Sequence, residues 1–201
     1  LTAASSLALI VANLLPLIGV LSGHITLTQI MILFWSESAI IGFFTLLKMI
    51  IVGRWKAVLA APFFISHYGG FMAGHFVFIY SFFVGGLSGL TSQPALSALT
   101  ALYKPLWLAA GALVVSHALS FALNFIGRRE YRGESVDTLM VAPYRRVFVL
   151  HLTVIFGGWM TMAFQSTAPA VALLIALKTI TDLMAHRRED RKSTRLNSSH
   201  T

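Results

Sequence analysis

A small set of ionisable side chains lies inside otherwise apolar stretches of this chain. They are Glu37, His67, His75, His117, His151, Lys178 and Asp182. An ionisable group in hydrocarbon costs about 2.5–3.5 kcal/mol on insertion scales, so each should face a protein interior and have a partner. Neutral imidazole is the commonest biological metal ligand, and carboxylates complete many such sites. These residue types indicate either a metal or haem site or a relay of proton-carrying groups.

The composition requires membrane helices to position these groups. Of 201 residues, 57% are hydrophobic and only 11% are charged, and the mean hydropathy is +0.78. A soluble domain carries about 25% charged residues, which argues against a soluble fold. The chain has no cysteine, and this excludes a disulfide scaffold, a thiolate metal site and a cysteine nucleophile.

Six stretches contain the roughly 20 apolar residues that a spanning helix needs. The spans are predicted at residues 3–22, 26–49, 58–84, 105–126, 146–164 and 168–186. Lys and Arg alternate between the connections, which places both termini and the 50–57 and 127–146 loops in the cytoplasm. The predicted fold is therefore an all-α, six-helix transmembrane bundle, N-in and C-in, in a bacterial inner membrane. Its partner is the lipid bilayer and not nucleic acid, although the net charge is +8.

Two arginine pairs flank the longest cytoplasmic loop, Arg128 with Arg129 and Arg145 with Arg146. Arginines at span ends anchor topology by snorkelling to the interface. A site for lipid headgroups is the alternative interpretation.

The topology assigns depths to the intramembrane groups. At 1.5 Å per residue, four of them fall within a slab of about 8 Å in the inner half of the membrane, whereas His75 lies about 12 Å further out than His67. The four are His67, His117, His151 and Asp182. The three histidines are therefore the candidate metal ligands for a transition metal or a haem, whose identity the sequence does not select.

The remaining polar groups have supporting roles in this hypothesis. Glu37, nearer the midplane, and Asp182 are the candidate carboxylates that would ligate, orient a ligand or act as a base. Lys178 and Asp182 are four residues apart and could form an ion pair, and Lys178 could instead neutralise Glu37. Asn124 shares a helix face with His117.

Five segments of the chain resemble a bacterial integral-membrane family of unknown function, the domain-of-unknown-function family numbered 6498. They are FWSESAIIGFF (34–44), HYGGFMAGHFVFI (67–79), SHALSFALNF (116–125), RRVFVLHLTVIFGGW (145–159) and LKTITDL (177–183). The likeness covers residues 1–189, which we expect to form a single domain, and it implies no activity. The segment DRKSTRLNSSH (190–200) resembles a translated sequencing adapter, so residues 190–201 are expected to be an artefactual, disordered tail.

Three functions remain open from the sequence. The first is a protein with an intramembrane site for a metal or haem, which could support catalysis or redox work. The second is a small proton-coupled transporter in which the same groups form a relay, and the third is a scaffold whose polar residues only join helices. Whether the protein is an enzyme, which catalytic residues it would use and whether it forms a homo-oligomer stay undecided.

Overall fold

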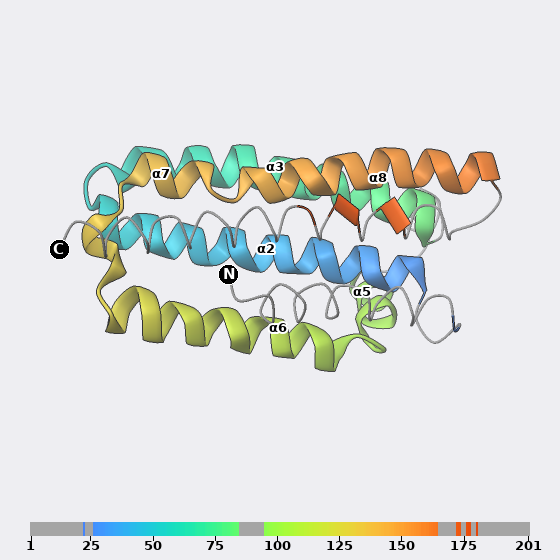
Figure 1. Cartoon of the computed structure of the whole chain (residues 1–201), viewed down its shortest axis with the longest axis horizontal. Helices are drawn as coiled ribbons and strands as arrows, with labels where there is room; N and C mark the ends of the chain where they lie inside the picture. The colour runs from blue at the N-terminus through green and yellow to red at the C-terminus, as the bar shows by residue number, and fades with distance from the viewer. Residues whose placement is uncertain are drawn as a thin grey trace, which may run out of the picture. The chain divides into compact units, whose positions relative to one another are not determined.

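The described part of the chain is helical throughout. The structure is a computed structural model, and it describes residues 22, 26–84, 95–164, 172–173, 176–177 and 180. The elements in order are α2 (Leu27–Gly53), α3 (Ala57–Phe83), α5 (Ala95–Tyr103), α6 (Trp107–Ser120), the π-helix η1 (Phe121–Gly127), the 3-10 helix η2 (Glu130–Gly133), α7 (Val136–Val141) and α8 (Tyr144–Phe164) (Figure 1). No strand occurs in these ranges, so the predicted all-α class is confirmed.

Four helical stretches are long and apolar enough to cross a membrane. They are Leu27–Gly53, Ala57–Phe83, Trp107–Gly127 and Val136–Phe164. Three agree with predicted spans to within four residues at each end, but the last begins at Val136 and not at 146 because α7 precedes α8. The predicted spans 3–22 and 168–186 and the tail 190–201 lie almost wholly outside the described residues.

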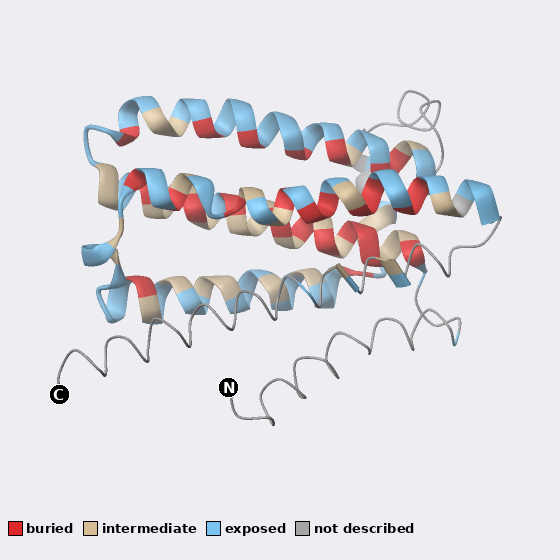
Figure 2. Cartoon of the chain, turned by 45° about the horizontal axis from the view of Figure 1, so that its top comes forward, coloured by how far each residue is buried: buried red, intermediate tan, exposed pale blue. Residues whose placement is uncertain are grey.

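The chain divides into two compact units, and the four stretches contribute mainly to the unit Thr28–Val154. The other unit, Leu1–Leu27 with Ile155–Thr201, contains the second half of α8 among its described residues. In the unit Thr28–Val154, consecutive spans run in opposite directions (Figure 1). Buried residues gather along α2 and the sides of α3 and α8 that face it, whereas α6 buries no residue (Figure 2).

Two hydrogen bonds from aromatic side chains join α2 to α3. The indole Nε1 of Trp35 donates to the carbonyl of Met72 at 2.8 Å, and the Tyr68 hydroxyl donates to the carbonyl of Ser38 at 2.7 Å. Aromatic residues can be buried in this way because their single polar atom finds a partner. Both bonds fix the rotation of α2 against α3, and this rotation decides where Glu37 points.

Gly42 allows the Tyr68 ring to approach α2. A Cβ atom at Gly42 would lie 2.3 Å from Cε1 of Tyr68, and the ring cannot swing away without breaking its bond to Ser38. We therefore expect Gly42→Ala to lower the free energy of unfolding by about 1–3 kcal/mol, measured by equilibrium unfolding in detergent micelles. Gly69→Ala is the control, because its Cβ would meet nothing within 4 Å. Equal stability of the two variants would contradict this account of the contact.

A short helix, α5, lies in the connection between the predicted spans 58–84 and 105–126. The hydroxyl of Tyr103, its last residue, lies 2.6 Å from the Ser36 hydroxyl of α2. Burial raises the pKa of Tyr103, and the hydrogen bond with Ser36 lowers it by less. Tyr103 is therefore a neutral phenol at physiological pH, tied to the residue next to Glu37.

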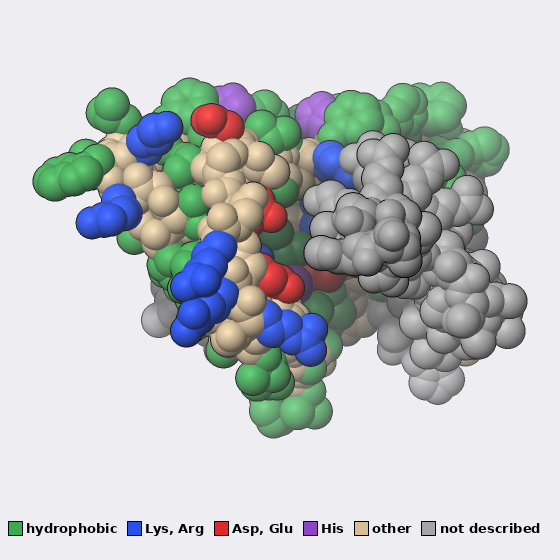
Figure 3. All heavy atoms as spheres, turned by 60° about the vertical axis from the view of Figure 1, so that its left-hand side comes forward, with side chains coloured by type: hydrophobic (Ala, Val, Ile, Leu, Met, Phe, Trp, Pro, Cys, Tyr) green, Lys and Arg blue, Asp and Glu red, His purple; other side chains and the backbone are tan. Residues whose placement is uncertain are grey.

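Basic residues gather at the opposite end of this unit. Gly53, the last residue of α2, lies against Val136, the first residue of α7, so the 54–56 turn and the connection between η1 and α7 share one end. Lys and Arg side chains are interspersed with acidic ones there (Figure 3). The basic residues of these connections are Arg54, Lys56, Arg128, Arg129 and Arg132.

Candidate functional site

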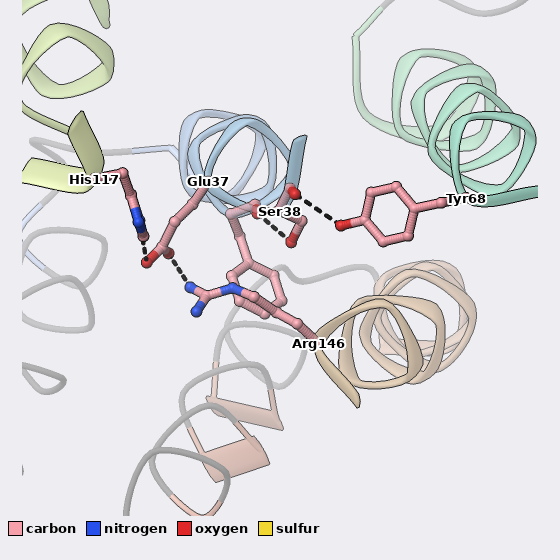
Figure 4. Close-up of polar contacts among 6 residues, drawn as sticks. Glu37, Ser38, Tyr68, His117 and Arg146 are labelled. Atoms are coloured by element: carbon pink, nitrogen blue, oxygen red, sulfur yellow. Dashed lines mark hydrogen bonds and ion pairs between the residues drawn. The ribbon is translucent and has the colours of Figure 1, made fainter. Parts of the chain in front are cut away.

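Glu37 lies between a guanidinium and an imidazole from two other helices. Arg146 of α8 forms an ion pair with Glu37 Oε2, and Nε2 of His117 on α6 lies 4.0 Å from Glu37 Oε1. The three side chains converge from three helices (Figure 4). Only 19% of Glu37, 21% of Arg146 and 28% of His117 are exposed, so the cluster is largely shielded from its surroundings.

The serines beside Glu37 are not its partners. The hydroxyls of Ser36 and Ser38 donate to the carbonyls one turn earlier, at 2.7 Å and 3.0 Å, a common way for helical serines to satisfy their hydrogen bonds. Glu37 and Ser38 leave α2 on different sides, toward His117 and Tyr68 respectively (Figure 4). The carboxylate consequently depends on Arg146 and His117 for compensation.

The sequence interpretation treated Arg146 as a topology anchor or as part of a lipid-headgroup site, and it missed the ion pair of this arginine with Glu37. The continuous span begins at Val136, so Arg146 lies ten residues, or about 15 Å, along it. Its guanidinium carbon also lies 5.4 Å from the ring centroid of Phe34. The helix signal was available in VDTLMV (136–141), which has the capping residue Ser135 before it.

A polar cavity adjoins the cluster on the side of His117. Its volume is about 70 Å³, and residues of α2, α6 and η1 line it. These are Ile41, Phe44, Thr45, Lys48, His117, Ser120 and Phe121. The π-helix η1 directly follows α6, and such widened turns occur frequently at functional sites.

The predicted metal site of three histidines is not assembled. His67 Nδ1 lies 2.7 Å from the Tyr144 hydroxyl, His151 Nδ1 lies 3.0 Å from Nε2 of His75, and His117 faces Glu37. In the ranges that the structure describes, no group of three His, Cys, Asp or Glu side chains could hold a metal ion. Equal depth along separate helices did not make the imidazoles neighbours, because the rotation of each helix turned them toward different partners.

His75, which the depth estimate separated from the other histidines, pairs with His151. Nδ1 of His75 lies 2.6 Å from the Phe71 carbonyl, so this nitrogen carries a proton and donates it. In neutral His75 the other nitrogen, Nε2, is then an acceptor, and His151 donates through Nδ1. The direct hydrogen bond leaves no space for a haem iron between the two rings.

Two of the predicted polar groups, Lys178 and Asp182, lie outside the described residues. The amide nitrogen of Asn124, which lies in η1, is 3.5 Å from the hydroxyl of Ser120, a residue of the cavity wall. Glu37 forms an ion pair with Arg146, and the prediction that Lys178 could neutralise Glu37 concerns a residue outside the described ranges.

The fold and the cluster together define an all-helical protein whose apolar helices are compatible with a membrane and surround a partly buried carboxylate. The chain belongs to the family described as a family of unknown function (DUF6498), which it matches over residues 1–199. This confirms the resemblance found in the sequence, and the match includes most of the segment expected to be an artefactual tail. No curated protein and no solved structure matches the chain.

Proposed function

We propose that this protein is a small proton-coupled membrane transporter in which Glu37 and His117 bind the proton. The proposal includes six membrane spans formed by residues 1–189, with both termini in the cytoplasm of a bacterium. It replaces the metal or haem site favoured by the sequence, because the three predicted ligands, His67, His117 and His151, lie in separate contacts.

The observation that carries the proposal is the composition of the cluster around Glu37. A buried ion pair rarely adds net stability compared with apolar residues of the same size, whereas ionisable groups at membrane depth commonly mark ion and proton pathways. Arg146 stays charged at every physiological pH, but Glu37 and His117 can both gain and lose a proton. With Glu37 ionised and His117 neutral, the cluster has no net charge, so one proton can enter and leave it.

Proton movement in reconstituted vesicles tests this function. Purified protein is placed in liposomes that contain a pH-sensitive dye, and an inward proton gradient is applied with and without a mixture of small solutes outside. We expect acidification of the lumen severalfold faster than in protein-free vesicles under at least one of these conditions. If vesicles with and without the protein acidify at the same rate, both in the presence and in the absence of the solutes, transport is contradicted and the scaffold interpretation is supported.

A further inference from the structure

We propose that the cavity beside His117 binds a small monovalent anion, which is carried together with the proton. This inference rests on the proposed function and names the substrate class of the same site. Halides, nitrate and formate are of the proposed class.

The first support is a cation that has no carboxylate partner. Lys48 lines the cavity, and in the part of the chain that the structure describes no acidic side chain pairs with it. Its Nζ lies 5.0 Å from the ring centroid of Phe125, so a cation–π contact partly compensates its charge. A charge within an apolar span needs a counterion, and an anion in the adjoining cavity would supply one.

The second support is the chemistry of the cavity wall. Besides Lys48, the hydroxyl-bearing residues Thr45 and Ser120 line it, as does the imidazole of His117. Ammonium, hydroxyl and imidazole groups can all donate hydrogen bonds, whereas no carboxylate belongs to this lining. Such a wall favours an anion over a cation.

The size and location of the cavity limit the range of candidate ligands further. The cavity of about 70 Å³ is several times the roughly 10–15 Å³ that one water molecule needs by the same measure. This volume accommodates a halide or a one-carbon carboxylate. Lys48 lies five residues, or about 7.5 Å, before the end of α2 at Gly53, on the side of the basic connections, whose positive potential would concentrate anions near the cavity.

The contact between His117 and Glu37 explains why the anion would travel with a proton. His117 belongs to the cavity wall and lies 4.0 Å from the carboxylate. A proton on His117 would stabilise an anion in the cavity, and the anion would stabilise the proton. One anion and one proton together carry no net charge, which minimises the cost of crossing a low-dielectric membrane interior.

Thermal unfolding in detergent tests the site without requiring transport. The midpoint is measured by tryptophan fluorescence in sodium chloride and in sodium gluconate at equal ionic strength, since gluconate is a much larger anion than those of the proposed class. We expect chloride to raise the wild-type midpoint by about 2–4 °C. Lys48→Met should abolish this shift, whereas Lys104→Met, an exposed cation at the other end of the unit, should retain it.

Thr45→Val removes one hydroxyl without changing the charge, and it should reduce the shift even if Lys48→Met fails to fold. No shift in the wild type, or an undiminished shift in both cavity variants, would overturn the anion site.

The coupling of the anion to the proton is tested in vesicles. An inward chloride gradient should acidify the lumen even when no potassium carrier such as valinomycin is present, because the movement of one anion with one proton transfers no net charge. If protons move at a rate that does not depend on chloride, the coupling is overturned but the proposed function stands. If chloride binds in a manner that depends on Lys48 but no protons move, the proposed function is refuted and the anion site stands.

Discussion

Replacing Arg146 with methionine is expected to lower the free energy of unfolding by about 3–5 kcal/mol, because the substitution leaves an uncompensated carboxylate in the protein interior. Glu37 is only 19% exposed, and the hydroxyls of Ser36 and Ser38 are already bonded to backbone carbonyls. Methionine occupies a similar volume to the apolar part of arginine, so the loss measures charge rather than packing. Equilibrium unfolding in mixed micelles gives the value.

Two further variants separate the charge effect from a general effect on α8. Arg145→Met changes the neighbouring arginine, which is exposed, and should alter stability by no more than about 0.5 kcal/mol. The double variant Glu37→Gln with Arg146→Met removes both charges and should recover at least half of the loss. A small effect of Arg146→Met, or no recovery in the double variant, would mean that the ion pair does not hold α2 to α8.

The sequence was sufficient to predict three of the four described spans because each apolar stretch signals a span through its own local composition. The predicted 26–49 and 58–84 became Leu27–Gly53 and Ala57–Phe83. The beginning of the last described span was missed because Pro143 and two arginines follow α7, and this polar interruption resembles a loop end. The apolar helical stretch continues through it from Val136, so Arg146 lies within that stretch and reaches Glu37.

The partners of the polar groups could not be predicted from sequence, since they depend on which helices are neighbours and how each is rotated. His67 and His75 illustrate this limit. Their spacing of eight residues correctly separated them, but nothing local indicated that His75 would meet His151 at 3.0 Å while His67 would meet Tyr144 at 2.7 Å. The depth of a side chain follows from its position along one helix, whereas its partner depends on how several helices are arranged.

Glu37→Gln is expected to reduce proton movement into vesicles by about a factor of 10 or more, because it removes the carboxylate that accepts the proton and keeps the shape of the side chain. Glu37→Asp keeps an acidic group and should retain part of the activity. Glu130→Gln is the matched control, since it makes the same chemical change at an exposed position of η2. Lumen pH is followed with the trapped dye at equal protein content.

Loss of activity in Glu37→Gln could also arise if the unpaired guanidinium of Arg146 disturbs the fold, so the double variant with Arg146→Met is decisive. It removes the unpaired cation as well as the carboxylate. Restored stability without restored proton movement would identify Glu37 as a proton carrier rather than a structural counterion to Arg146. Wild-type rates in Glu37→Gln, measured on protein that unfolds at the wild-type midpoint, would exclude that role, because glutamine cannot bind and release a proton in the physiological pH range.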